Sequence, residues 1–223
     1  MAKPPSLKGE VFECGLEDGC TDELFLPNPG APFGRFSAVL DPARKKDVPV
    51  LCIFDKKIKT AVRFYEYDRM PAPDLEDAVL IDCAKWGAYK LTVDETGGGF
   101  YVVDHLKQKI RERGKQMIVK GISLAGGTKA LIIEQLKHRI ESWSIRYTRD
   151  PELLRQLENF TIKELDSGSI RYSAPKGDYD DYVDALAIAN SEDIKYPYNE
   201  QQVVANSSRM ARHKQNSISI IHS

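Results

Sequence analysis

The sequence has no marked excess of charge of either sign, no long hydrophobic run and few cysteines. Its 223 residues carry 32 lysines and arginines against 33 aspartates and glutamates, so the formal net charge is −1 and no overall positive field points to a nucleic-acid partner. No apolar run approaches the roughly 18 residues of a membrane-spanning helix, and the N-terminus lacks the apolar stretch of a signal peptide. We therefore expect an intracellular, soluble protein in which any nucleic-acid site is local.

Cysteines and histidines are sparse and irregularly spaced. The four cysteines include no pair at the spacing of a zinc knuckle, and we expect reduced thiols. The spacing of the four histidines builds neither a metal site nor a Ser-His-Asp triad. The glycine-rich stretch at 121–129 lacks the Gly-Lys-Ser/Thr of a P-loop. These absences argue against zinc-knuckle proteins, triad hydrolases and P-loop ATPases.

The overall composition is that of a globular protein with one large domain. Hydrophobic residues make up 42% and charged residues 29% of the chain, which is enough to bury a core. Residues 1–35 are rich in proline and glycine and predict a linker or an N-terminal arm. Residues 36–195 predict a single α/β domain, and residues 196–223, rich in polar side chains, predict a flexible C-terminal tail.

Hydrophobic periodicity predicts strands first and then alternating helices and strands. We expect strands at 36–41, 48–54, 58–67, 89–94, 116–120, 161–165 and 170–172. We expect helices at 73–86, 100–113, 128–143, 151–160 and 179–194. This order is typical of a mixed α/β sheet flanked by helices.

Two aspartates end predicted buried strands. Asp41 precedes a proline, and Asp94, with Glu95 beside it, precedes Thr and three glycines. Open α/β sheets place their functional sites at the carboxyl ends of strands, and glycines would let a phosphate backbone approach closely. Taken singly, each aspartate is also explained by a turn that ends a strand.

A third group of acids lies at the start of the last predicted helix. A spacing of three places Asp181 and Asp184 on one face, beside an alanine-rich apolar stripe. Carboxylates this close repel one another unless a cation is present. An acidic N-cap region explains Asp178 and Asp180 but not Asp184, which lies a turn inside the helix. Together the three groups predict hard oxygen ligands that converge on two divalent ions for phosphodiester hydrolysis.

These motifs resemble the nuclease domain of the large terminase subunit of tailed bacteriophages, a member of the RNase H-like superfamily. The likeness rests on Asp41-Pro-Ala, on Val-Asp94-Glu-Thr-Gly-Gly-Gly and on Asp180-Asp181-Tyr-Val-Asp184-Ala-Leu-Ala-Ile-Ala, and it covers about residues 36–190. The last motif is also similar to Holliday-junction resolvases of the same superfamily. The resemblance implies an RNase H-like α/β fold, with a mixed central sheet flanked by helices.

The resemblance implies an endonuclease that cuts double-stranded viral DNA concatemers with two Mg²⁺ or Mn²⁺ ions. The implied ligands are Asp41, Asp94, Asp181 and Asp184, with Asp180 and Glu95 as alternatives, and the implied catalytic residues are Asp41, Asp94 and Asp184. Asp41 would bridge both ions. One ion would activate the attacking water, and the other would stabilise the leaving 3′ oxygen. Helical spacing to Asp184 favours Asp181 over Asp180, but the choice between them stays open.

Local cations would hold the DNA. The predicted DNA-binding residues are Arg44, Lys45, Lys46, Lys107, Arg111 and Lys129. The first three follow Asp41, and Lys107 and Arg111 belong to a basic helix that a solvated surface would explain equally well. Lys129 begins a helix, where it either faces a phosphate or pairs with an acid.

The resemblance also implies partners and a place of action. The implied partners are the terminase ATPase domain, the small terminase subunit and the portal. The implied place of action is the cytoplasm of an infected bacterial host. In isolation the nuclease domain would be a monomer. Large terminases carry an ATPase domain ahead of the nuclease, and this sequence has none, so we expect a separately encoded nuclease or a fragment. The alternatives are a junction resolvase and a non-catalytic packaging-motor interaction domain whose acids only cap helices and strands.

Overall fold

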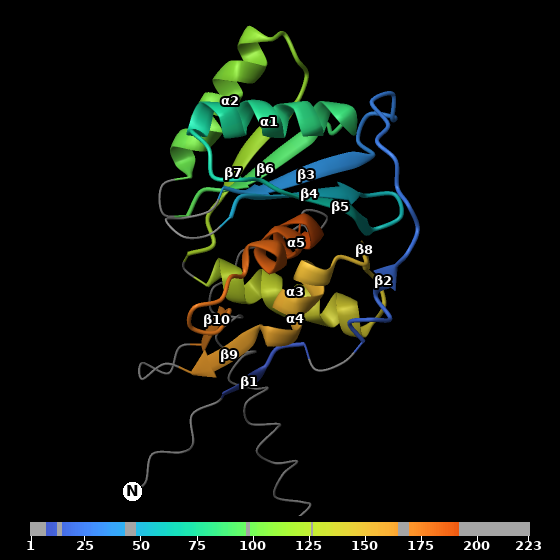
Figure 1. Ribbon diagram of the computed structural model, residues 1–223, viewed down its shortest axis with the longest axis vertical. Helices are drawn as coiled ribbons and strands as arrows, with labels where there is room; N and C mark the ends of the chain where they lie inside the picture. The colour runs from blue at the N-terminus through green and yellow to red at the C-terminus, as the bar shows by residue number, and fades with distance from the viewer. Residues whose placement is uncertain are drawn as a thin grey trace, which may run out of the picture.

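A seven-stranded sheet with helices on both faces forms the centre of the protein, and a three-stranded sheet lies beyond the helices of one face (Figure 1). The computed structural model describes residues 8–12, 15–42, 48–96, 99–125, 127–164 and 170–191. Within these ranges no helix has both the length and the apolar character needed to cross a membrane. The predicted tail at 196–223 and the basic residues at 44–46 lie outside the described residues.

The central sheet has the strand order β2-β8-β5-β4-β3-β6-β7. Its strands are β2 (Cys20–Thr21), β3 (Phe36–Asp41), β4 (Val50–Asp55), β5 (Thr60–Glu66), β6 (Lys90–Asp94), β7 (Ile118–Ile122) and β8 (Arg146–Thr148). The strands β3, β4 and β5 pair antiparallel, whereas β6 runs parallel to β3 and β7 parallel to β6. Every residue of β3 and β4 is buried, because helices cover both faces of the sheet.

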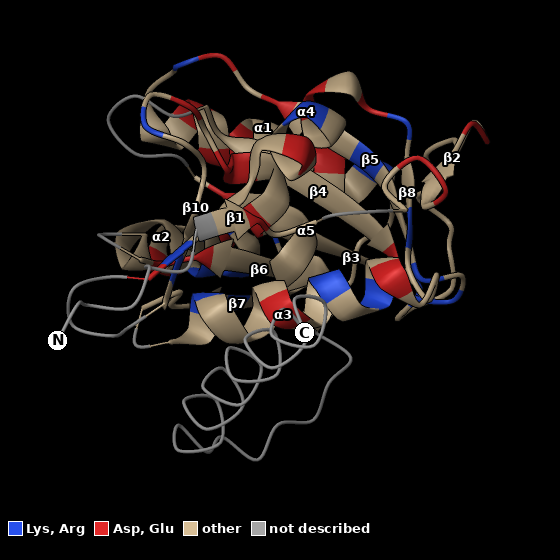
Figure 2. Cartoon of the chain, turned by 90° about the horizontal axis from the view of Figure 1, so that it is seen from below, with Lys and Arg blue, Asp and Glu red and all other residues tan. Residues whose placement is uncertain are grey.

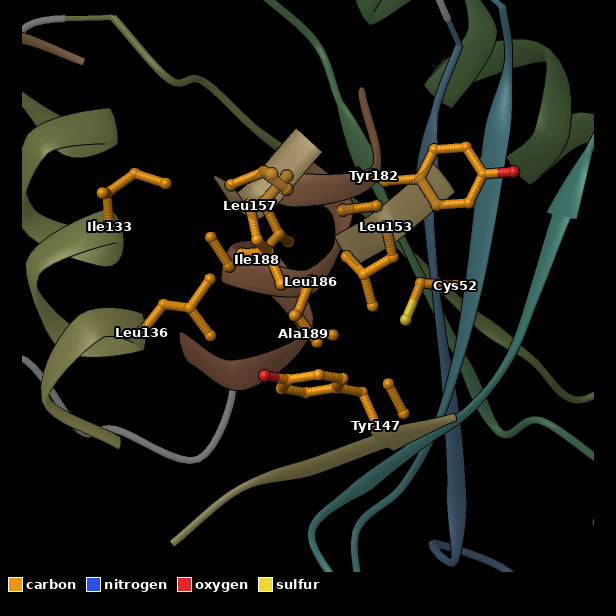
Figure 3. Packing of buried hydrophobic residues seen from close by; sticks show 14 of the residues in the cluster. Cys52, Ile133, Leu136, Tyr147, Leu153, Leu157, Tyr182, Leu186, Ile188 and Ala189 are labelled. Atoms are coloured by element: carbon orange, nitrogen blue, oxygen red, sulfur yellow. The ribbon is translucent and has the colours of Figure 1, made fainter. Parts of the chain in front are cut away.

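Helices α1 (Ala72–Lys85) and α2 (Phe100–Glu112) cover one face of the sheet, and α5 (Asp181–Ser191) covers the other (Figure 1). Helices α3 (Thr128–Glu141) and α4 (Pro151–Asn159) pack on α5 from outside, as Figure 3 shows for Leu136, Leu153 and Leu186. All residues of α5 are buried, because the helix lies between the sheet and two other helices. Its alanines keep it narrow enough for that position.

The smaller sheet is antiparallel, with the order β1-β9-β10. It consists of β1 (Lys8–Glu10), β9 (Thr161–Glu164) and β10 (Ile170–Ser173). Residues before Phe36, predicted as a linker or arm, thus add one strand to each sheet, and Val11 and Phe12 are buried in the core that contains α5. Strands β1, β2 and β8 were not predicted, because two or three residues are too few for a visible period.

Candidate metal centre

Asp41 and Asp94 end neighbouring parallel strands and point to the same face of the sheet. Leu40 of β3 pairs with Val93 of β6, so the two aspartates follow side by side. Val39 packs in the core that contains α5, and Asp41, two residues on, faces the same way. Val93 packs in the opposite core, so the adjacent Asp94 also points toward α5. Both carboxylates are buried, with 8% and 5% of the residue exposed.

The first turn of α5 brings further carboxylates to the same place. Asp181 and Asp184 are buried, with 5% and 6% exposed, and Asp180 immediately precedes the helix. Together with Asp41 and Asp94 they line one cavity of about 450 Å³. The other lining residues are Thr96, Leu124, Gly127, Lys129, Ala130, Ile170, Arg171, Tyr172 and Ser173. The positive end of the α5 dipole stabilises negative charge at this point.

Lys129 is the cation that balances these carboxylates from α3. Its Nζ lies 2.6 Å from Asp180 Oδ2 and 2.5 Å from Asp184 Oδ2. Burial opposes the charged form, but the attraction of Asp184 and Asp180 outweighs burial and raises the pKa of Lys129. Of the two predictions for Lys129, contact with a phosphate or pairing with an acid, the structure has the second. The ammonium lies between the two carboxylates.

The pKa of Asp184 is strongly raised in this cavity. Burial raises the pKa of Asp184 to about 8, and Asp180 and Asp41 add to the rise, although Lys129 opposes it. Its Oδ1 atom is buried and accepts no hydrogen bond from any described residue. A carboxylate with a buried, unsatisfied oxygen, surrounded by other carboxylates, is a donor set that suits a hard divalent cation.

Metal binding would require a rearrangement around Lys129. Among the described residues, no three His, Cys, Asp or Glu side chains are already arranged to hold a metal ion. Lys129 bridges Asp180 and Asp184 and thereby occupies the space between them. The residue types fit a metal centre, and withdrawal of the ammonium would free two carboxylate oxygens for it.

Thr96 fixes the Asp94 carboxylate, a contact that sequence reasoning missed. The amide of Thr96 donates to Asp94 Oδ1 at 2.9 Å, its hydroxyl contacts the same oxygen, and the amide of Leu124 donates to Thr96 Oγ1 at 2.7 Å. The Asp-x-Thr pattern is an Asx turn that could have indicated this contact. Gly99 is required here by close packing, since a Cβ on it would lie 2.2 Å from the Asp94 carbonyl oxygen.

Glu95, the alternative ligand, lies elsewhere. A Cβ added to Gly121 of β7 would lie 1.9 Å from Glu95 Oε2, so the carboxylate rests over the glycine of the neighbouring strand. Glu95 is not among the residues that line the cavity, whereas Asp180 and Asp181 both are. The structure thus places both of the adjacent aspartates at the candidate site and Glu95 outside it.

The predicted DNA-binding residues are scattered. Lys107 and Arg111 belong to α2, on the face of the sheet opposite α5, and Lys107 lies 3.7 Å from Asp104. In Figure 2, basic positions on α3, α4 and β5 are interspersed with acidic ones. Arg171, which was not predicted, is exposed on β10 and lines the cavity. The sequence did not assign it to the site, because its place at the cavity depends on how the small sheet packs.

The raised pKa of Asp184 predicts how pH acts on stability. An unfolded Asp loses its proton near pH 4, whereas Asp184 in the folded, metal-free protein keeps its proton up to about pH 8. The unfolded state therefore binds fewer protons in this interval, and this group makes the metal-free protein less stable as pH rises from about 4 to 8. Because a metal needs the ionised carboxylate, stabilisation by Mn²⁺ should grow over the same interval.

Thermal denaturation at pH 6, 7 and 8, with EDTA or Mn²⁺, measures both trends. The Asp184→Asn variant is the control, and its pH dependence should be flatter. An Mn²⁺-induced rise in Tm that is equal at all three pH values in the wild type would contradict the prediction.

Comparison with solved structures reveals the same fold in several viral proteins, among them the following three. The large terminase nuclease from thermophilic phage G20c with bound magnesium is 19% identical, with a TM-score of 0.67, over 82% of this chain and 97% of that chain. The nuclease domain of the large terminase subunit of bacterial virus Sf6 is 12% identical, with a TM-score of 0.65, over 85% and 100%. The HK97 bacteriophage large terminase is 11% identical, with a TM-score of 0.57, over 83% and 44%.

These likenesses confirm the predicted fold. The protein has the RNase H-like fold of large terminase nuclease domains, with a mixed sheet flanked by helices. It spans less than half of the HK97 protein. No protein-family model and no curated protein sequence matches the chain. At identities of 11–19%, the likeness is one of fold, so activity has to be argued from the residues of the cavity.

Proposed function

We propose that this protein is a metal-dependent endonuclease that cuts double-stranded viral DNA concatemers during genome packaging. The observation that carries the proposal is the cavity in which Asp41, Asp94, Asp181 and Asp184 come together, all buried and drawn from two strands and a helix. Burial of four carboxylates has a large desolvation cost, which a structural role in turns or caps does not require. The shared fold with large terminase nucleases points to the same chemistry.

We propose two divalent ions, Mg²⁺ or Mn²⁺, held by Asp41, Asp94, Asp181 and Asp184, with Asp180 beside them. Structures of this fold bear bound magnesium or cobalt in phage G20c and manganese or calcium in Sf6. Such ions, when bound, activate a water molecule and stabilise the departing oxygen. Carboxylate oxygens are the ligands that these ions prefer.

The protein's own residues would orient the metal ligands and contact the DNA. Thr96 keeps Asp94 directed into the cavity, and Lys129 would hold Asp180 and Asp184 in place in the metal-free protein. Arg171, exposed on the cavity wall, is placed to contact a DNA phosphate. Because we expect contacts with phosphates to hold the DNA, cutting would be largely independent of sequence.

The proposal extends to partners. From the shared fold with large terminases, we propose that an ATPase domain, a small terminase subunit and a portal act with the nuclease in the host cytoplasm. Lys107 and Arg111 lie on the opposite face of the sheet, so they would contact DNA only if it extends beyond the cavity.

Digestion of linear, supercoiled and four-way-junction DNA with Mg²⁺, Mn²⁺ or EDTA tests the proposed function. Metal-dependent cutting of plain duplex supports a terminase-type nuclease. Selective cutting of junctions would instead indicate a junction resolvase. If the folded protein cuts no DNA and binds no metal in calorimetry, it is a non-catalytic interaction domain.

A further inference from the structure

Helix α4 lies behind the acidic end of α5 and contributes nothing to the cavity lining. Leu153 and Leu157 of α4 are fully buried and pack near Tyr182 and Leu186 of α5 (Figure 3). Besides these apolar contacts, α4 directs polar side chains toward the segment that enters α5. This arrangement joins α4 to the same short stretch of chain that carries the candidate ligands.

Gln156 caps α5 from outside the helix. Its side chain is almost fully buried, with 3% of the residue exposed, and its Oε1 accepts a hydrogen bond from the Tyr182 amide at 3.0 Å. Its Nε2 donates to Glu152 Oε1 at 2.9 Å, which fixes the orientation of the amide group. The first amides of a helix have no partner within the helix, and a side chain just before the helix usually supplies one. In α5 the Tyr182 amide instead receives its cap from another helix.

Arg155 holds the other end of the same stretch. Its Nη1 and Nη2 donate to the two carboxylate oxygens of Asp178 at 2.7 and 2.8 Å. Its Nε and Nη2 donate to Glu152 at 2.8 and 2.6 Å. The Arg155 guanidinium lowers the pKa of both Asp178 and Glu152, so both stay ionised at neutral pH. The planar guanidinium makes this a rigid bridge between α4 and Asp178.

Asp180 and Asp181 lie between these two attachment points. Asp178 is held two residues before Asp180, and the Tyr182 amide is held one residue after Asp181. Because Gln156 supplies the cap, the Asp180 side chain is available to face the cavity and bind Lys129. The direction of both carboxylates therefore depends on α4.

We propose that Gln156 and Arg155 are positioning residues that set the direction of the Asp180 and Asp181 carboxylates toward the cavity. The inference rests on the proposed function only in taking this cavity as a metal centre. Neither side chain would contact metal or DNA. Both would act through the backbone of residues 178–182, as outer partners that orient metal ligands do in other proteins.

Hydrogen exchange in the metal-free protein tests the positioning directly. The Gln156→Leu variant removes the cap, and we expect exchange of the Tyr182 amide to accelerate about five- to tenfold relative to amides deeper in α5, such as that of Leu186. The Gln156→Met variant is closer in size to the wild type, also lacks an acceptor for the Tyr182 amide, and should show the same acceleration. Leu153→Ala is the matched control, because it weakens the packing of α4 without removing a hydrogen bond.

Calorimetric titration with Mn²⁺ then tests whether the direction of the Asp180 and Asp181 carboxylates affects metal affinity. Affinity should fall about tenfold in Gln156→Leu and Gln156→Met and stay near the wild-type value in Leu153→Ala. Unchanged exchange of the Tyr182 amide, or an unchanged Mn²⁺ affinity, in Gln156→Leu would overturn the proposal. Should Gln156→Leu not fold, wild-type exchange of the Tyr182 amide in Gln156→Met would overturn it equally. Failure of the wild type to bind Mn²⁺ would count against the proposed function, while the exchange result still decides the positioning.

Discussion

Replacing Asp184 with asparagine is expected to reduce metal-dependent DNA cutting by about a hundred- to a thousandfold, because a neutral amide binds a divalent ion far less well than a carboxylate. A metal ion supplies several kcal/mol of transition-state stabilisation, and each 1.36 kcal/mol corresponds to about a tenfold change in rate. The fold should survive. Asparagine has nearly the same shape as aspartate, and removing one of several crowded charges relieves the repulsion from Asp180 and Asp41.

Asp82→Asn is the matched control for this variant. Asp82 is also buried, with 8% exposed, but it lies on α1, where it accepts hydrogen bonds from Tyr67 and Lys85 at 2.9 and 2.8 Å. Its substitution should lower Tm and leave cutting per folded molecule unchanged. Initial cutting rates and circular dichroism melts of both variants give the measurement. Full metal-dependent cutting by Asp184→Asn would show that Asp184 is not a catalytic metal ligand.

The second large effect is expected from Lys129→Met, measured without metal. The change leaves Asp180 and Asp184 without their cation, and breaking a buried ion pair of this kind costs about 2–3 kcal/mol when part of the side chain is exposed, as it is here at 22%. The loss of stability should be larger at pH 8 than at pH 6, because Asp184 ionises over this range. Added Mn²⁺ should restore most of the lost stability, since it supplies the missing positive charge.

Lys109→Met separates this effect from a general loss of an ion pair. Lys109 of α2 has a similar exposure of 20% and lies 2.5 Å from Asp77 and 3.1 Å from Glu76, far from the cavity. This variant should also lose stability in EDTA, but Mn²⁺ should recover no more of it than it adds to the wild type. Melting curves with EDTA and with Mn²⁺ at both pH values measure the difference. Equal recovery in the two variants would show that Lys129 does not occupy a cation position.

The structure also bears on whether the acidic cluster only caps α5. An acidic N-cap region was the competing explanation for Asp178 and Asp180. Asp178 instead forms an ion pair with Arg155, Asp180 contacts Lys129, and Gln156 caps the Tyr182 amide. Capping of α5 therefore does not account for the side chains of these two aspartates.

Periodicity predicted the long elements well, because burial on one or both faces imposes a pattern on every residue of such an element. The strand β3 and the helices α2 and α3 were predicted to within two residues of their bounds. The short strands β1, β2 and β8 had no such pattern, since their pairing depends on distant parts of the chain.

The sequence by itself determined which acids end buried strands and which lie on one face of the last helix, because strand and helix periods are local properties. Local pattern therefore singled out Asp41, Asp94, Asp181 and Asp184 as candidates, with Asp180 and Glu95 as alternatives. Only the tertiary structure decided that they share one cavity, that Lys129 lies between Asp180 and Asp184, and that Glu95 lies outside. The contacts of Lys129 join residues 51 and 55 positions apart, and packing of the helices against the sheet, which no local pattern encodes, brings them together.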